Sequence, residues 1–201
     1  MVQNMSGDRH LDLGCGSTPR NPYGRKHLYG VDIRDLVAEG VSMDFQYRPA
    51  NLFSQKIPFD DNHFSSVSAY DFLEHVPRTR IKDNGETRFP FIDVMDEIYR
   101  VLEPGGRLFA LTPFYPHAEC FQDPTHVNII TRRTHEYFCG ERAGAKIYGF
   151  KGSFKCIRSQ PAPASASIEG PNHTFAKRVR YFRKSLRGQL THLIWEFEAV
   201  K

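Results

Sequence analysis

Short apolar runs bounded by turn-forming residues dominate the first 150 positions of this chain, and such runs predict strands. The four runs with the length and apolar character of buried strands are His10–Leu13, Leu28–Ile33, Phe64–Tyr70 and Arg107–Thr112. Between the last two, apolar residues recur at helical spacing until Pro104-Gly105-Gly106 ends the helix. The apolar residues of this helix are Phe91, Ile92, Met95, Ile98, Tyr99 and Leu102. Strands that alternate with a helix predict an α/β fold.

The second half of the chain has a weaker pattern. We expect a short helix over Thr131–Cys139, a strand over Lys146–Phe150 and a final strand over His192–Val200. Apolar and polar positions alternate in the final strand, which suits a strand at the edge of a sheet. Gln160–Ser167 is rich in Pro, Ala and Ser and predicts a surface loop.

A basic stretch precedes the final strand. Phe175–Arg187 carries six Lys and Arg residues and no acid, and apolar residues are interleaved with them. Such a stretch can hold a phosphate-bearing acceptor, a nucleic acid or an anionic membrane surface. Charge runs are usually solvated faces, so we favour an amphipathic insertion between the last two strands.

Length and composition then narrow the class of protein. The chain has 201 residues, of which 40% are hydrophobic and 25% charged, so we expect one globular domain over residues 1–201. Residues 1–100 carry 12 basic and 15 acidic side chains, and residues 101–201 carry 15 basic and 8 acidic ones. The halves therefore have net charges of −3 and +7, and the total of +4 is too small to indicate nucleic-acid binding by itself.

Four widely spaced cysteines without a Cys-x-x-Cys pair predict free thiols and a reducing compartment. The first ten residues are polar, and the chain nowhere reaches the roughly 18 apolar residues that span a bilayer. We therefore expect a cytoplasmic protein with no membrane span.

A glycine-rich turn after the first strand is the strongest chemical signal. Leu11–Gly16 ends in Gly14-Cys15-Gly16, and glycines there let the backbone approach a ligand without a β-carbon clash. Asp32 ends the second strand, where nucleotide-binding α/β folds place an acid that accepts hydrogen bonds from ribose hydroxyls. A carboxylate repels a 2′-phosphate, so an adenosine-type ligand is favoured over NADP.

Five segments, in order along the chain, resemble the motifs of class I S-adenosylmethionine-dependent methyltransferases. They are the glycine-rich Leu11–Gly16, the acidic Gly30–Ile33, Ile57–Phe64 entering the fourth strand, Leu73–Val76 leaving it, and Glu97–Gly106 before the fifth strand. The resemblance implies a Rossmann-like methyltransferase fold, a mainly parallel seven-strand sheet with helices on both faces and an antiparallel last strand. It divides the domain into a cofactor-binding half, about 1–112, and an acceptor loop with a C-terminal insertion, about 113–190.

The resemblance also implies S-adenosyl-L-methionine as the cofactor. The glycine-rich turn would line its methionine part, with support from Asp12, while Asp32 would hold the ribose and Ile33 would pack on the adenine. Tyr70 would lie beside the cofactor where the chain leaves the fourth strand. The complete implied set is Asp12, Gly14, Cys15, Gly16, Asp32, Ile33, Asn51, Leu52 and Tyr70.

Two features depart from the family pattern. Asn51 stands where the family usually has an acid near the adenine amino group, although an amide oxygen accepts the same hydrogen bond. The glycine-rich turn continues as Ser17–Pro22, and the next strand follows so soon that the usual first helix must be short or replaced by a loop. Arg20 in this loop could reach the cofactor carboxylate, but we favour a solvated surface arginine.

The loop after the fifth strand, Thr112–His126, is the candidate acceptor site, because loops at that end of a parallel sheet face the ligand cleft. We expect His126 to act as a general base or to position the acceptor, supported by Asp123 or His117, since a neutral imidazole accepts a proton near pH 7. An equally weighted alternative makes Asp123–His126 a turn whose side chains cap the backbone.

This region also offers potential metal ligands, namely His117, Cys120, His126, His135 and Cys139. A His-x-x-Cys spacing is not a zinc signature by itself, and the second cysteine pair of a structural zinc site is absent from the sequence. We therefore expect no metal.

The sequence thus predicts an enzyme that transfers a methyl group from S-adenosylmethionine to an oxygen or nitrogen of a small or sugar-like polar acceptor; a nucleic-acid acceptor is possible but not favoured. The alternative is a catalytically inactive protein of this fold that binds the cofactor or S-adenosylhomocysteine, or acts as a scaffold. A dinucleotide oxidoreductase is disfavoured, because Pro19 stands where the Gly-x-Gly-x-x-Gly fingerprint has its third glycine.

Overall fold

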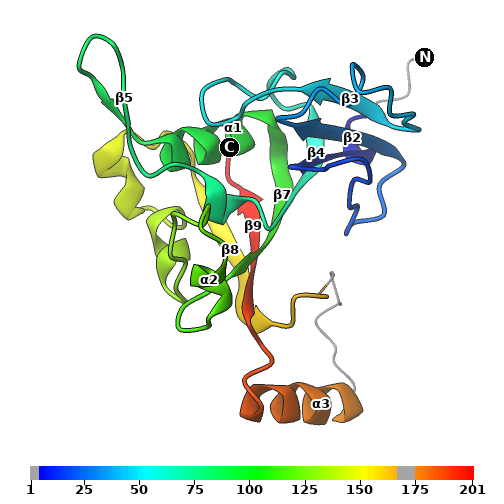
Figure 1. Cartoon of the computed structure of the whole chain (residues 1–201), viewed down its shortest axis with the longest axis vertical. Helices are drawn as coiled ribbons and strands as arrows, with labels where there is room; N and C mark the ends of the chain where they lie inside the picture. Colours follow the sequence, from blue (N-terminus) through cyan, green and yellow to red (C-terminus); the bar gives the residue numbers. More distant parts are fainter. Residues whose placement is uncertain (1–4, 167–174) are drawn as a thin grey trace.

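The computed structural model describes residues 5–166 and 175–201, and within them seven strands form one central sheet (Figure 1). Their spatial order is β3-β2-β1-β4-β7-β9-β8. The strands are β1 (Arg9–Leu13), β2 (His27–Asp32), β3 (Gln46–Pro49), β4 (Phe64–Tyr70), β7 (Leu102–Pro113), β8 (Phe154–Ala162) and β9 (His192–Ala199). Strands β1, β2, β3, β4 and β7 pair in parallel, and β9 is antiparallel to both of its neighbours. The predicted fold class, including the antiparallel last strand, is confirmed.

Helices and short turns connect these strands. The α-helices are α1 (Pro90–Val101), α2 (Glu119–Gln122) and α3 (Phe175–Leu186). The 3-10 turns are η1 (Met5–Asp8), η2 (Leu73–His75), η3 (Thr134–Tyr137) and η4 (Gly144–Tyr148), and β5 (Arg80–Ile81) and β6 (Thr87–Arg88) form a separate hairpin. The connection from β1 to β2 contains no helix, as the short spacing predicts.

The main core lies where α1 covers one face of the sheet. The helix buries Val94, Met95, Ile98 and Val101, of which Met95 and Ile98 were predicted, and each such side chain contributes about 1.5–3 kcal/mol when fully buried. The helix ends at Val101, earlier than predicted, because Leu102 and the Pro104–Gly106 segment already belong to β7. A smaller cluster on the other face contains Phe109, Leu111 and Ile194. Tyr23, from the loop after β1, packs against this cluster. A loop therefore covers part of a face where the family pattern places a helix.

The final strand is not an edge strand, so that prediction is wrong. β9 lies between β7 and β8, and its register places Glu196 opposite Arg158 and Glu198 opposite Arg107. Both glutamates form ion pairs with those arginines, at 3.2 and 2.9 Å. The alternating polar positions therefore reflect paired charges inside the sheet rather than an exposed face.

Other local predictions also need correction. Lys146–Phe150 is not a strand, because η4 occupies most of it, Ile147 is 87% exposed and Gly149 ends the turn at a φ of +91°. The helix expected over Thr131–Cys139 shortens to the single turn η3. The loop expected over Gln160–Ser167 begins later, since β8 continues to Ala162; Ser167 lies outside the described residues.

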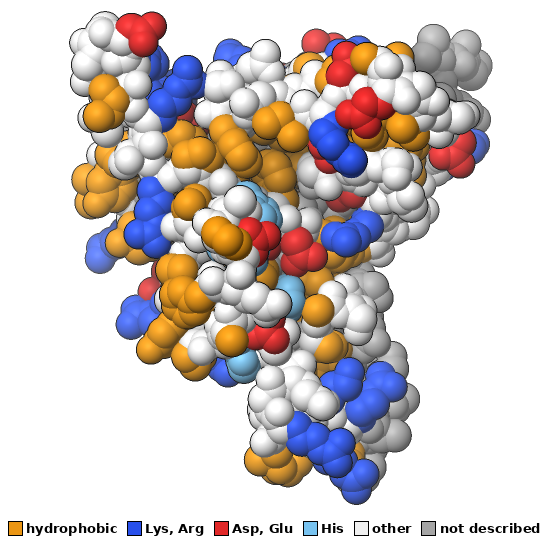
Figure 2. Space-filling view, in the orientation of Figure 1, with side chains coloured by type: hydrophobic (Ala, Val, Ile, Leu, Met, Phe, Trp, Pro, Cys, Tyr) orange, Lys and Arg blue, Asp and Glu red, His pale blue; other side chains and the backbone are white. Residues whose placement is uncertain are grey.

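The basic stretch forms α3, which stands between β8 and β9 in the chain and projects from the body of the molecule (Figure 1). Lys and Arg side chains gather over this projection (Figure 2). Phe182 and Leu186 are 64% and 72% exposed. The predicted insertion between the last two strands is confirmed, and its described apolar side chains do not join the core.

A buried histidine makes stability depend on pH. His10 of β1 is fully buried, and its two ring nitrogens lie 2.8 Å from the hydroxyls of Ser66 and Ser68 on β4. Burial lowers the pKa of His10 from 6.5 to about 3. Between these two pKa values, the unfolded chain binds a proton at His10 that the folded protein does not bind. The contribution of His10 to stability is therefore lost as the pH falls below 6.5.

We expect His10→Gln to weaken this pH dependence. Between pH 7.5 and pH 5, the free energy of unfolding of the parent should fall by about 2 kcal/mol more than that of the variant. Urea titrations of both proteins at the two pH values measure this difference, and the other titrating groups cancel because both proteins share them. Parallel losses in parent and variant would contradict the assignment to His10.

Candidate active site

The glycine-rich turn after β1 and the carboxyl end of β2 border a cavity of about 220 Å³. Its lining consists of Gly14, Val31, Asp32, Ile33, Ala50, Asn51, Leu52, Phe53, Phe72 and His75. Parallel strands leave their carboxyl ends at one edge of the sheet, and this edge is where α/β folds bind ligands. Five of the nine predicted cofactor residues therefore line one cavity, namely Gly14, Asp32, Ile33, Asn51 and Leu52.

The turn has the backbone that a close ligand requires. Gly14 and Gly16 have φ values of +66° and +55°, which side-chain-bearing residues rarely adopt. The amide of Gly16 donates to Asp32 Oδ2 at 2.9 Å, and the amide of Arg34 donates to Oδ1 at 3.1 Å. Asp32 thus connects the first and second strands at the cavity edge.

One side of the cavity is apolar. Ile33 is 63% exposed although it is a large aliphatic residue. The apolar lining also contains Val31, Ala50, Leu52, Phe53 and Phe72. Asn51 Oδ1 accepts a hydrogen bond from the amide of Phe53, so the amide oxygen expected to meet an adenine caps a local turn.

The other four predicted cofactor residues lie outside the lining. Asp12 is buried and accepts hydrogen bonds from the amide of Arg20 and the hydroxyl of Ser68, which supports the loop after β1 as expected. Burial raises the pKa of Asp12 to about 6. Gly16 contacts the site through Asp32, whereas the Cys15 thiol is buried.

Tyr70 and Arg20 contact each other. The Arg20 guanidinium carbon lies 4.5 Å from the centre of the Tyr70 ring, and Tyr70 also packs on Phe109 in the smaller core cluster. Arg20 is exposed, as favoured from the sequence, but its guanidinium stacks on this aromatic ring.

A second cavity, of about 560 Å³, lies beside the acceptor loop. It is lined by Asp71, Glu74, Pro113, Glu119, Gln122, Asp123, Pro124, His126 and His192. The loop supplies His126 and Asp123, as the sequence predicts, and His126 Nε2 lies 4.0 Å from Asp123 Oδ2. His117 is not part of this lining; its ring packs 5.0 Å from that of Phe114. Histidine and acidic side chains gather near the middle of this face (Figure 2).

Asp123 and Thr125 also form the backbone-capping turn that the sequence leaves as an alternative. Asp123 Oδ1 accepts hydrogen bonds from the amide and the hydroxyl of Thr125, at 2.8 and 2.7 Å. The His126 ring is held separately, because its Nδ1 lies 3.0 Å from the carbonyl oxygen of Glu119. The capping turn and the placement of His126 in the cavity therefore coexist.

The lining residues that were not predicted as site residues include two acids and two histidines. Asp71, Glu74 and His75 follow β4, and His192 begins β9 with its Nε2 3.2 Å from Asp71 Oδ1. Burial raises the pKa of Glu74 to about 8, and burial together with the nearby His126 lowers the pKa of His75. Glu74 and His75 belong to a segment already identified as a family motif, and that was the available signal.

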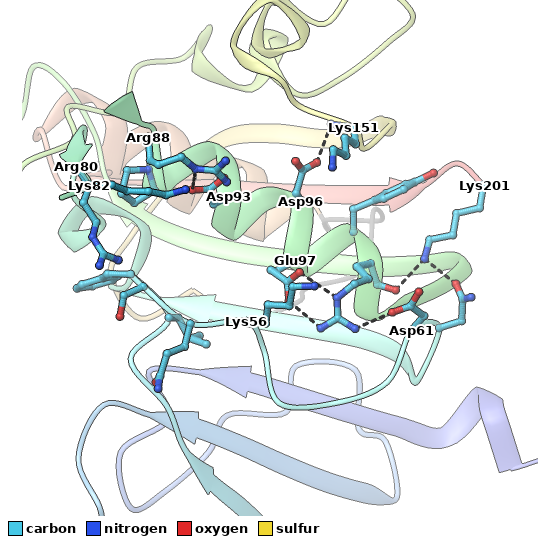
Figure 3. A pocket seen from close by; sticks show the side chains of 18 residues that line it. Lys56, Asp61, Arg80, Lys82, Arg88, Asp93, Asp96, Glu97, Lys151 and Lys201 are labelled. Atoms are coloured by element: carbon cyan, nitrogen blue, oxygen red, sulfur yellow. Dashed lines mark hydrogen bonds and ion pairs between the residues drawn. The ribbon is translucent and has the colours of Figure 1, made fainter. Parts of the chain in front are cut away.

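A larger cavity, of about 690 Å³, lies elsewhere, beside α1 and the β5–β6 hairpin (Figure 3). Its carboxylates already have partners. Arg100 pairs with Glu97 and Asp61, and Arg88 pairs with Asp93. Asp96 accepts from the amides of Lys151 and Gly152. These contacts hold α1 to its neighbours, so we assign this cavity a structural role.

The fold is that of an α/β protein with a cavity at the carboxyl ends of its parallel strands, where such folds bind ligands. The family of methyltransferase domains matches residues 11–110, the region that holds this turn, Asp32 and α1. The ubiquinone/menaquinone biosynthesis C-methyltransferase of Psychromonas ingrahamii is 32% identical over 103 residues, which are 50% of this chain and 34% of that protein. The chain therefore spans about a third of the length of this relative.

Solved structures agree on the fold. A methyltransferase in complex with the Trm112 activator of Haloferax volcanii aligns with a TM-score of 0.59 and 16% identity, covering 97% of this chain and 84% of that one. A geranyl diphosphate methyltransferase in complex with S-adenosylmethionine aligns with a TM-score of 0.56 and 17% identity, covering 97% and 79%. The chain belongs to the family of methyltransferase domains, and the solved structures share the Rossmann-like fold that the sequence predicts.

Proposed function

We propose that the protein transfers the methyl group of S-adenosylmethionine to an oxygen or nitrogen of a small or sugar-like polar acceptor. The juxtaposition of the two cavities carries this proposal. His75 lines the cofactor cavity, and its chain neighbour Glu74 lines the acceptor cavity. A methyl donor in the first cavity would thus face an acceptor in the second across two adjacent residues.

Methyl transfer requires the protein mainly to align the methyl donor with the acceptor. The methyl carbon leaves the positively charged sulfur as the C–S bond breaks, the bonding electron pair stays on sulfur, and a lone pair of the acceptor forms the new bond. The acceptor then loses a proton. His126 would receive or direct this proton, supported by Asp123; His117, away from the cavity, would act only through the loop.

Charge in the acceptor cavity favours a neutral or cationic acceptor. Asp71, Glu119 and Asp123 line it with carboxylates, and the buried Glu74, whose pKa is raised to about 8, adds a fourth acidic side chain, although the C-terminal half of the chain is basic overall. Sugar hydroxyls and amines suit such a lining, whereas phosphates would be repelled. The C-methyltransferase relative is named for a carbon acceptor, but this polar cavity supports an oxygen or nitrogen acceptor better.

The inactive binding protein remains the competing proposal, and one pair of experiments separates the two. Calorimetry should show saturable binding of S-adenosylmethionine and of S-adenosylhomocysteine. Release of S-adenosylhomocysteine should then increase with a member of a panel of free sugars and amines, and nucleotide-linked sugars serve as the phosphate-bearing comparison. Binding of these compounds without turnover of any panel member would favour the inactive binding protein. If the protein binds neither S-adenosylmethionine nor S-adenosylhomocysteine, both proposals are refuted.

The single-domain organisation over residues 1–201 and a cytoplasmic location complete the proposal. Cys15, Cys120, Cys139 and Cys156 are all free, which suits a reducing compartment. Among the described residues, no helix is long and apolar enough to cross a membrane.

A further inference from the structure

Glu74 is a buried carboxylate without a partner. It belongs to η2, the turn that follows β4, and its side chain is 1% exposed. Neither carboxylate oxygen accepts a hydrogen bond from any described residue. A buried carboxyl group whose two oxygens both lack a hydrogen-bond partner is costly whether it is charged or protonated, so this residue requires an explanation.

Two histidines stand next to this carboxylate. His75 is its chain neighbour, and His126 comes from the acceptor loop, with the two imidazole rings 4.7 Å apart and steeply inclined. One ligand atom from each of Glu74, His75 and His126 lies within 4.8 Å of the others. Ligand atoms about 2.1 Å from a bound cation lie roughly 3 to 3.5 Å apart, so small side-chain rotations would close this set around one ion.

Hydrogen bonds fix which nitrogen of His75 remains available. The Thr125 hydroxyl donates to Asp123, and the same oxygen lies 2.8 Å from His75 Nδ1. Because the hydroxyl proton is directed at the carboxylate, the Thr125 oxygen accepts the proton of Nδ1. The Nε2 lone pair of His75 is therefore free to bind a cation.

His126 has the same arrangement. Its Nδ1 lies 3.0 Å from the carbonyl oxygen of Glu119, which can only accept, so Nδ1 carries the proton and Nε2 the lone pair. Metal-binding histidines usually donate their second nitrogen to a carbonyl or to a carboxylate-linked group, which fixes the ring orientation. Both imidazoles thus have the supporting contacts of ligands.

We propose that Glu74, His75 and His126 bind one divalent transition-metal ion at the junction of the cofactor and acceptor cavities. This set differs from the five His and Cys residues considered from the sequence and shares only His126 with them. Two imidazoles and one carboxylate suit Zn²⁺, Fe²⁺, Co²⁺ or Ni²⁺ better than Mg²⁺ or Ca²⁺, which prefer oxygen ligands. Three protein ligands leave coordination positions open toward the acceptor cavity.

A cation there would also define the acceptor, an inference that rests on the proposed function. A hydroxyl coordinated to the ion becomes more acidic and is held near the methyl donor. Of the two roles proposed above for His126, an ion bound to its Nε2 leaves only that of directing the proton: His126 would hold the ion that acidifies the hydroxyl, and the proton would pass to solvent. A molecule with two adjacent hydroxyls, which can chelate the ion, is the expected acceptor class.

Metal binding is tested first without any acceptor. Untagged protein is treated with EDTA, dialysed and titrated with Zn²⁺ by calorimetry, and with Co²⁺ by visible absorption. We expect one ion per chain, and visible Co²⁺ bands that report nitrogen ligation. Glu74→Gln and His126→Ala should each weaken Zn²⁺ binding by more than the roughly 10- to 100-fold that follows loss of a supporting contact.

Two further variants sharpen the test. Thr125→Val removes the hydroxyl that orients His75 and should weaken Zn²⁺ binding by about 10- to 100-fold. His117→Ala removes an imidazole of the same loop outside the cluster and should bind Zn²⁺ like the parent. Circular dichroism and binding of S-adenosylmethionine check that each variant is folded.

The proposal is overturned if the parent binds no Zn²⁺ or Co²⁺, or if Glu74→Gln binds Zn²⁺ as tightly as the parent. These results are independent of the proposed function, because they require neither methyl transfer nor an acceptor. Zn²⁺ binding through these residues without any turnover would support the metal site and contradict the proposed methyltransferase activity.

Discussion

Replacing His126 by alanine is expected to lower the turnover number for methyl transfer by about 10²- to 10⁴-fold, the range in which a positioned acid–base group contributes. His126 lies in the acceptor cavity, and its side chain is only 10% exposed. It does not line the cofactor cavity, so the affinity for S-adenosylmethionine should stay within about twofold of the parent, well below one tenfold step. Release of S-adenosylhomocysteine in the presence of an active panel acceptor measures the first effect, and calorimetry measures the second.

Two histidines of the same region provide controls for this prediction. His135 lies outside both cavities, with its Nδ1 near the carbonyl oxygen of Arg132, so His135→Ala should retain turnover. His117→Ala should reduce turnover less than His126→Ala, because His117 acts only through the loop. Equal losses in all three variants would show a general effect on the loop, and unchanged turnover in His126→Ala would exclude this residue from the chemistry.

The cofactor half could be predicted from sequence because its signals are local. The glycine-rich turn, Asp32 and the spacing of apolar residues in α1 each occupy a few consecutive positions. Parallel pairing then brings the ends of β1 and β2 together, with Asp12 opposite Gly30 and Leu13 opposite Val31. Local pattern and known sheet geometry together place Gly14 beside Asp32.

The acceptor half could be predicted only in part, because its geometry depends on contacts between distant segments. The backbone amides of Val127 and Asn128 both donate to the carbonyl oxygen of Glu74, and this contact brings the acceptor loop onto the turn after β4. The hydrophobic periodicity of neither segment predicts this contact. The sequence therefore identified His126 and Asp123 in the loop but could not pair them with Glu74 or His75.

The wrong strand predictions have a similar cause. Alternation in β9 comes from glutamates whose arginine partners lie on β7 and β8, and such cross-strand pairing cannot be identified from one strand alone. The apolar character of Lys146–Phe150 likewise suggests a strand, but glycines at positions 144 and 149 enclose a tight turn instead. Charged partners on the neighbouring strands determine the pattern of β9, and a tight backbone turn prevents a strand at Lys146–Phe150.

Asp32→Ala is expected to weaken binding of S-adenosylmethionine by about 10- to 100-fold, because hydrogen bonds to a charged group contribute about 1.5–3 kcal/mol. The variant loses the carboxylate proposed to hold the ribose and also leaves the amide of Gly16 without its present acceptor. Asp32→Asn keeps an oxygen for Gly16 but removes the charge, so its loss of affinity should be smaller. Calorimetry with each variant measures both effects.

The matched control for this prediction is Asp35→Ala. Asp35 is an exposed acid three residues further along, and its carboxylate accepts only a local hydrogen bond from the amide of Ala38. Its removal changes the net charge by the same amount as Asp32→Ala, so a general electrostatic effect on the cofactor would appear in both variants. If Asp32→Ala binds S-adenosylmethionine like Asp35→Ala, the ribose is not held at the end of β2. Loss confined to Asp32→Ala, with thermal unfolding close to that of the parent, instead attributes the affinity to this carboxylate rather than to the overall charge of the acidic half.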